Sequence, residues 1–164
     1  MSGAVKLVTA EVLADCPFSI SQDYAEAFLH QAQVAGGDFA IRVPIGFVPA
    51  AVRHRVTMTF ALQYDVAERG RGHDEIGVRW KAGTSLLPDF SGTVRFRIAG
   101  GGTLVRVEGS YSVPFGVVGE LFDDLAGARV AHASAMDFAE QLGTYLERRQ
   151  RAWRSEVLDE LLVK

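Results

Sequence analysis

The residues best suited to chemistry lie on one face of a strand that alternating residue types predict at 52–64. Of the four histidines, only His54 falls on the apolar face of such a strand. A histidine there can donate to a ligand carbonyl, or act as a general acid or base near neutral pH. Tyr64 shares its face, and Tyr111 lies on the apolar face of a later strand. The competing interpretation is a satisfied strand-end histidine, because no neighbouring inward carboxylate is available to orient the imidazole.

Other site chemistries find little support in the sequence. The remaining histidines are scattered and Cys16 is the single cysteine, so no metal-ligand spacing exists and neither a metal nor a cofactor is expected. Cys16 has no identifiable base nearby, which favours a structural cysteine over a nucleophile. The glycines at 100–102 join two strands, whereas a phosphate cradle requires a helix after the glycines. That segment is therefore predicted to be a hairpin turn.

The elements that must position these residues follow from the hydrophobic period. Alternation predicts six strands, at about 5–13, 39–45, 52–64, 76–82, 94–98 and 105–113. Pro44 cannot donate to a strand ladder, so the second strand is predicted to lie at an edge. Helical spacing predicts a helix at 20–34, and after Gly116 a short helix that pauses at Gly127 before a long one.

An apolar set lies between the predicted sheet and the long helix. Such a set with a few polar groups is how proteins usually hold small hydrophobic ligands. The candidate ligand-binding residues are His54, Met58, Phe60, Tyr64, Trp80, Phe96, Tyr111, Phe138 and Leu142. Ser134 and Asp137 offer further polar groups from the helix. Because methionine and aromatic stripes also fill ordinary cores, a ligand pocket and a packed core remain alternatives at this point.

The opposite face of the predicted sheet is rich in arginine. Its basic residues are Arg53, Arg55, Arg79, Lys81, Arg95, Arg97 and Arg106, with Glu108 as the main acid among them. This set predicts either a basic field that docks an acidic partner, or a solvated face whose arginines pair with carboxylates from loops. No aromatic residues interleave for base stacking, and the net charge is −3, so no nucleic acid is expected as a partner.

Composition is that of an ordinary globular domain. The 164 residues fit one domain, with 48% hydrophobic and 23% charged residues. No apolar run is long enough for a membrane span, so integral membrane association is not expected. A single cysteine and the absence of a signal peptide predict a cytoplasmic protein.

The order of elements carries a resemblance to a known family. Segments 92–96, 102–105 and 114–122, followed by a helix at 129–147, resemble the helix-grip fold of the START-like (SRPBCC, birch-pollen-allergen-like) superfamily, and within it the polyketide cyclase/dehydrase and lipid-transport group. The resemblance implies an α+β fold in which a curved antiparallel sheet of six or seven strands wraps around a long C-terminal helix. A seventh strand would fall around 43–52. The chain would then be a single START-like ligand-binding domain over 1–164, with a helical tail at 147–164.

Three functions are open on this basis. The leading hypothesis is binding of a small hydrophobic or lipid-like ligand, without catalysis, in a cavity between sheet and helix. The second is an enzyme of the polyketide cyclase or aromatase type, in which His54 with Tyr64 or Tyr111 transfers protons. The third is an interaction module that acts through the arginine-rich sheet face. A homodimer through Val157, Leu158, Leu161 and Leu162 of the tail is a further expectation.

Overall fold

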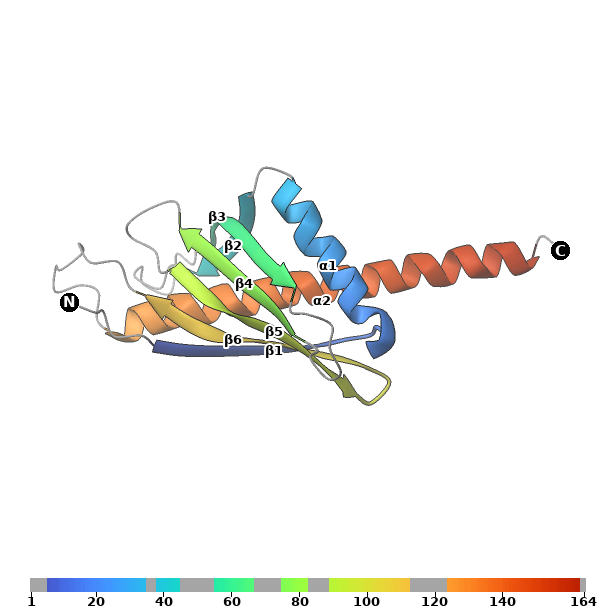
Figure 1. The fold of residues 1–164 in the computed structure, drawn as a ribbon, viewed down its shortest axis with the longest axis horizontal. Helices are drawn as coiled ribbons and strands as arrows, with labels where there is room; N and C mark the ends of the chain where they lie inside the picture. Colours follow the sequence, from blue (N-terminus) through green and yellow to red (C-terminus); the bar gives the residue numbers. More distant parts are fainter. Residues whose placement is uncertain are drawn as a thin grey trace.

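The computed structural model describes residues 6–34, 38–44, 55–66, 75–82, 89–112 and 124–162, and the side chains of 6–33, 75–81, 89–112 and 128–162. This part of the chain forms an antiparallel sheet and two helices (Figure 1). The elements are β1 (Lys6–Ala14), α1 (Phe18–Val34), β2 (Asp38–Pro44), β3 (Arg55–Val66), β4 (Glu75–Ala82), β5 (Asp89–Ala99), β6 (Gly102–Ser112) and α2 (Asp124–Leu162).

The strands form a single sheet in the order β1-β6-β5-β4-β3-β2. Strands β2 to β6 follow one another as antiparallel neighbours, and β1 closes the far edge by pairing with β6. The prediction of six strands is confirmed for the described residues, and so is the edge position of the strand that contains Pro44. Beyond Pro44, the region suggested for a seventh strand lies outside the described residues.

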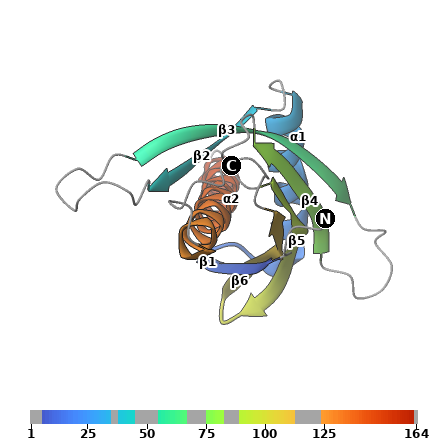
Figure 2. The same ribbon diagram turned by 90° about the vertical axis from the view of Figure 1, so that its left-hand side faces the viewer.

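The sheet curves around α2, as the view along that helix shows (Figure 2). Helix α2 packs against β1, β2, β6 and α1. It is continuous through Gly127, so the predicted pause there is wrong. One glycine costs a helix only about 1 kcal/mol, and the packing of the following turns offsets it. The helix also continues through the tail to Leu162.

The core lies between the inner face of the sheet and α2. Buried residues recur at every second position of the strands, for example at Ile76, Val78 and Trp80 of β4. Helix α2 contributes a stripe at helical spacing that includes Phe138, which is fully buried. Helix α1 closes one end of this core, where the Phe28 ring meets the Phe138 ring edge-on at a centroid distance of 6.3 Å.

The connection from β1 to α1 is tied to both sides of the core. The Thr103 hydroxyl of β6 donates a buried hydrogen bond of 2.7 Å to the Cys16 carbonyl. The Asp15 amide donates to the Glu147 carboxylate of α2 at 3.2 Å. Three residues before Thr103, Gly100 adopts a φ of 58° in the turn between β5 and β6. These two strands pair antiparallel, which confirms the predicted hairpin. These contacts hold α1, the sheet and α2 in one arrangement.

Membrane crossing by a helix finds no support here. Of the helices in the described ranges, neither has a segment both long and apolar enough to span a bilayer.

Candidate ligand-binding site

Five of the predicted ligand-binding residues come together in the core. Trp80, Phe96, Tyr111, Phe138 and Leu142 are each at most 3% exposed. The strands position the first three and α2 positions the other two. Their burial places them on the predicted inner face, while their role in holding a ligand stays a prediction.

The other four candidates are three residues of β3 and the histidine that precedes this strand in the sequence. His54 lies outside the described residues, and for Met58, Phe60 and Tyr64 the backbone of β3 alone is described. In the strand register Tyr64 stands opposite the buried Val78, and Phe60 stands opposite Ala82. Directly opposed residues of an antiparallel pair belong to the same sheet face.

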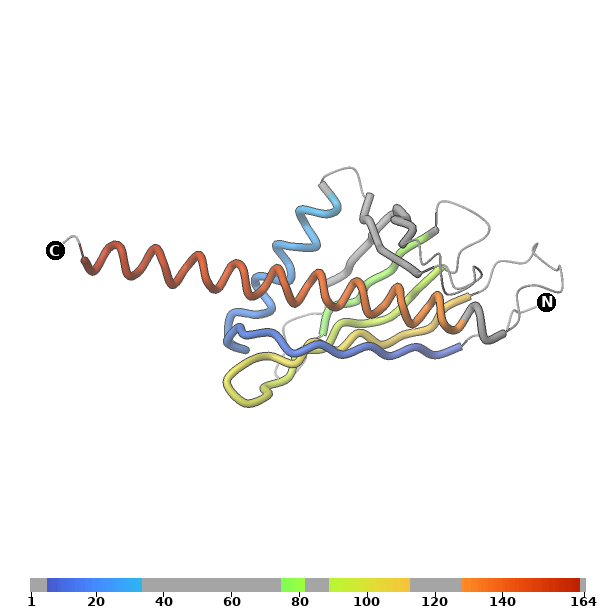
Figure 3. The backbone as a smooth tube through the Cα atoms, turned by 180° about the vertical axis from the view of Figure 1, so that it is seen from behind, coloured from blue at the N-terminus to red at the C-terminus, as the bar shows by residue number. Residues whose placement is uncertain are grey.

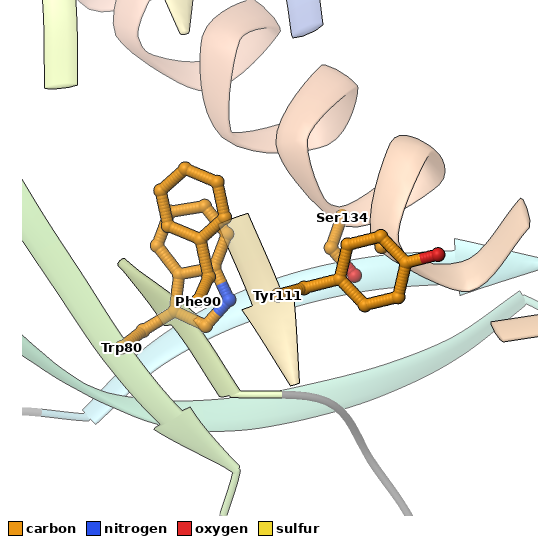
Figure 4. A pocket seen from close by; sticks show the side chains of 5 residues that line it. Trp80, Phe90, Tyr111 and Ser134 are labelled. Carbon is orange, nitrogen blue, oxygen red and sulfur yellow. The ribbon is translucent and has the colours of Figure 1, made fainter. Parts of the chain in front are cut away.

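A small recess opens between β4, β5, β6 and the first turns of α2 (Figure 4). Its lining consists of Trp80, Phe90, Tyr111, Ala131 and Ser134. The indole of Trp80 stacks on the Phe90 ring, with a centroid distance of 4.0 Å and an interplanar angle of 14°. Trp80 also contacts the Phe138 ring, at a centroid distance of 5.3 Å and an interplanar angle of 40°. These side chains pack so closely that no water molecule fits between them.

Two opposed glycines explain where the Phe90 ring lies. Gly92 of β5 and Gly109 of β6 are direct partners in the register. A Cβ atom on Gly109 would lie 2.8 Å from the Phe90 ring, and one on Gly92 would lie 2.7 Å from it. The ring therefore occupies the space that two ordinary side chains would fill, on the inner face beside Val78. The Phe90 ring thus fills the space beside both glycines, and Trp80 stacks on it.

The polar groups of the recess are two hydroxyls. Ser134 Oγ donates to the Val130 carbonyl at 2.8 Å, which anchors it on α2. The Tyr111 hydroxyl lies at the end of its ring away from the Trp80–Phe90 stack (Figure 4). The described residues that line this recess include neither a carboxylate nor an imidazole. Asp137, the other polar candidate from the helix, accepts a hydrogen bond from Gln141 at 2.7 Å and is not among the lining residues.

Sequence reasoning missed Phe90, and it placed Ala131 on the apolar stripe of the long helix without including it among the ligand-binding residues. The fifth strand was expected to begin near 94, whereas β5 begins at Asp89. A signal was present, because Phe90 is in phase with Val94 and Phe96 when counted in steps of two. Gly92 interrupts the apolar alternation between them and conceals it.

Metal and thiol chemistry are not supported in the described part of the chain. Within it, histidine, cysteine, aspartate and glutamate side chains form no group of three suited to a metal ion. Cys16 is fully buried. Burial, and then the nearby Asp15 charge, raise the pKa of its thiol to about 11. A thiol that stays protonated and inaccessible is a poor nucleophile.

On the outer face of the sheet, several of the predicted basic residues form ion pairs with carboxylates. Arg95 Nε lies 2.6 Å from Glu75, and its Nη1 lies 2.5 Å from Glu108. Arg106 Nε lies 3.0 Å from Glu108 and 3.4 Å from Glu11. The hydrogen bond that Arg95 donates to the Glu75 carboxylate raises the pKa of Arg95.

The carboxylates of this network come from neighbouring strands and not from loops, because the strand register aligns acids and arginines. The basic face is correspondingly smaller than predicted. Arg79, Lys81 and Arg97 remain as its exposed basic residues. Arg53 lies outside the described residues, and the Arg55 side chain is not described.

Comparison with known proteins is informative only at the level of structure. No family model matches the sequence, and no curated protein matches it. Solved structures do. The ZhuI aromatase/cyclase from Streptomyces sp. R1128 matches with a TM-score of 0.58 and 16% identity, over 91% of this chain and 98% of that one. Ara h 8.0201 matches with a TM-score of 0.51 and 10% identity, over 89% and 97% of the two chains.

A third solved structure, the di-domain ARO/CYC StfQ from the steffimycin biosynthetic pathway, has a TM-score of 0.51 and 13% identity. The match covers 89% of this chain and 52% of StfQ. At such identities a likeness establishes the fold and not the chemistry of the site. The chain shares with these structures the helix-grip fold, in which a curved antiparallel sheet wraps around a long C-terminal helix.

Proposed function

We propose that this protein binds a small hydrophobic molecule between α2 and the inner face of its sheet, at a site that includes the recess beside Trp80. The observation that carries the proposal is the composition of this recess. Three aromatic rings and Ala131 surround two hydroxyls, and no charged group lines it among the described residues. Apolar walls with a few polar groups favour an uncharged, largely apolar ligand.

The ligand gains its space by displacing Phe90. That ring is held by contact with the glycine pair and by stacking on Trp80. Such a stack contributes about 0.5–1.5 kcal/mol beyond area burial. A flat apolar ligand that stacks on Trp80 replaces this stack, which offsets part of the cost of moving the Phe90 ring out of the core. Backbone at Gly92 and Gly109 then lies open to the ligand, because no Cβ atoms cover it.

The two hydroxyls orient the ligand. Ser134 Oγ keeps a free acceptor position while it donates to Val130, and the Tyr111 hydroxyl both donates and accepts. A ligand with one hydroxyl at its edge meets both requirements, because it can donate to Ser134 Oγ and accept from the Tyr111 hydroxyl. This assigns specificity to Tyr111 and Ser134, and most of the affinity to contact with the aromatic side chains.

Native mass spectrometry of the protein purified from its own host tests this function, followed by extraction of whatever is bound. We expect a discrete mass increment and an uncharged hydrophobic molecule in the extract. The extracted molecule is then titrated into stripped protein that carries Trp153→Phe, so that Trp80 is the only tryptophan. Because Trp80 lies at the site, its emission should change saturably.

Two variants distinguish binding at this site from non-specific hydrophobic binding. Tyr111→Phe keeps the ring and removes one hydrogen bond, which should weaken binding about tenfold. Arg97→Gln, on the exposed outer face, should leave affinity unchanged. If host extract neither adds mass to the protein nor changes Trp80 emission, the proposal is wrong.

A second candidate function is catalysis of the cyclase or aromatase type, favoured by the position of Tyr111 at the recess. Two of the similar structures are an aromatase/cyclase and a di-domain ARO/CYC protein. In this function Tyr111, with His54, transfers protons to a reactive chain folded in the cavity. Incubation of the extracted molecule with stripped protein distinguishes the two functions. A product of changed structure that Tyr111→Phe abolishes indicates an enzyme, whereas unchanged recovery of the molecule indicates a binding protein.

A further inference from the structure

The last turns of α2 extend beyond the rest of the molecule into solvent (Figures 1 and 3). Leu142, Leu146 and Gln150 form the end of the buried stripe of this helix. The same spacing continues with apolar residues that none of the described elements covers. They include Trp153 at 52% exposed, Leu158 at 59%, Leu161 at 67% and Leu162 at 83%. An apolar helix face of this kind marks an interaction surface more often than a solvated one.

Charge is segregated along this part of the helix. We call Arg148, Arg149, Arg151 and Arg154 the basic segment, and Glu156, Asp159 and Glu160 the acidic segment. Like charges three or four residues apart repel one another on a helix. Acidic residues near a C-terminus also oppose the helix dipole, and the last turn of α2 holds no basic residue. An unpaired helix gains nothing from this arrangement.

The contacts of the two segments differ. Within the basic segment, Arg154 lies 3.7 Å from the Asp15 carboxylate, and Arg149 lies 5.5 Å from the centre of the Tyr24 ring. The acidic segment forms no ion pair with any other residue of the described ranges. A partner surface that presents positive charge beside apolar residues would complement it.

We propose that the exposed face of α2 pairs antiparallel with the same face of a second copy of the chain. In that orientation the basic segment of each helix lies beside the acidic segment of the other, around a twofold axis near Ser155. A parallel pair would place like charge beside like charge. Such a self-complementary contact is the ordinary form of a symmetric dimer. This inference is independent of the ligand and of its site.

The size of the surface sets the strength of the dimer. About three helical turns, or about 18 Å, follow Gln150. This contact falls at the low end of specific interfaces, so the dimer should form and dissociate with protein concentration. Trp153 is the expected anchor, because tryptophan contributes most where it becomes buried in a contact.

Sedimentation equilibrium of the full chain, from low micromolar to several hundred micromolar, tests the association. We expect the average mass to rise from 17.8 kDa toward twice that value. The triple variant Glu156→Lys, Asp159→Lys, Glu160→Lys, and the double variant Arg148→Glu, Arg151→Glu, should each weaken the dimer at least tenfold. An equimolar mixture of the two variants should associate again. Glu140→Lys, at an exposed position earlier on α2, is the matched control and should change nothing.

Cross-linking determines the orientation. Antiparallel pairing about Ser155 places the two copies of residue 157 about 6 Å apart along the helix axes, and the two copies of residue 161 about 18 Å apart. A short bismaleimide should therefore join Val157→Cys and not Leu161→Cys, with little background because Cys16 is buried. A chain that stays monomeric at several hundred micromolar overturns the proposal. So does equal cross-linking at both positions, which indicates a parallel pair.

Discussion

Phe90 is the side chain on which the shape of the recess depends most. It fills the space above Gly92 and Gly109 and supports Trp80. Its position also explains why a helix-grip fold with an apolar inner face leaves so little room at this point. The aromatic ring takes the place that a ligand would take, so binding and core stability compete for the same residue.

Replacing Phe90 with alanine should leave a cavity in the core, and its effect on stability can be measured. We expect Phe90→Ala to lower the free energy of unfolding by about 3–5 kcal/mol, measured by urea titration. A small aromatic molecule such as indole should restore part of the loss by filling the space. Ile98→Ala is the control on the same strand, because Ile98 is 72% exposed, and should cost no more than about 0.5 kcal/mol. Equal losses in the two variants would show that Phe90 is not a core residue.

Cys16 makes a pH-dependent contribution to stability. Its pKa in the folded protein is raised to about 11 from an ordinary value of 9.0, because burial and the Asp15 charge disfavour the thiolate. Since the folded-state pKa is the higher one, the neutral thiol stabilises the fold fully below about pH 9. This contribution is lost as the pH rises toward 11. The unfolding free energy of wild type minus that of Cys16→Ala should therefore shrink between pH 9 and 10.5. A difference that stays constant over this range would contradict the assignment.

At the scale of elements, the close pairing of β5 and β6 requires the glycine pair. A Cβ atom on Gly109 would lie 2.5 Å from the Ser91 carbonyl oxygen and 2.6 Å from the Gly92 Cα. These are backbone atoms that cannot move without breaking the ladder. The requirement is therefore one of space and not of backbone angle.

Gly109→Ala should consequently destabilise the fold, by about 2 kcal/mol or more in a thermal or urea melt. Gly101→Ala is a matched control in the same hairpin, because a Cβ atom there meets nothing within 4 Å. We expect that variant to be neutral or slightly stabilising, since alanine restricts the unfolded chain. Two variants of equal stability would mean that the strands can separate to admit a methyl group.

Within the whole molecule, helix α2 has two parts with different roles. Residues up to Gln150 complete the core, whereas residues from Arg151 onward are mostly exposed. Deletion of 156–164 should therefore change the unfolding free energy of the dilute protein by less than about 1 kcal/mol. Leu142→Ala, within the fully buried stripe, should cost about 2–5 kcal/mol. A large loss on deletion would show that the tail belongs to the folding unit.

Much of the fold could be predicted from residue pattern, because strand and helix periods are local properties. Strand β4 shows this best, since the buried Ile76, Val78 and Trp80 are those that alternation assigns to the inner face. The pause predicted at Gly127 was wrong, because the cost of one glycine is small beside the packing of the helix that follows. The outer face was misjudged for a similar reason. Apart from Glu108, its acids were sought in loops, whereas Glu75 and Glu11 lie on neighbouring strands.

The sequence by itself determined the order of elements, the apolar inner face and the burial of Trp80, Tyr111 and Phe138. Each of these follows from spacing along the chain. Only the tertiary structure decided that Phe90 lies over Gly92 and Gly109 and stacks on Trp80, because this depends on the register of three strands. Register joins residues far apart in sequence, and no local pattern specifies which glycine will face which. The structure also decided where α2 leaves the core, since that point depends on where the sheet and α1 end.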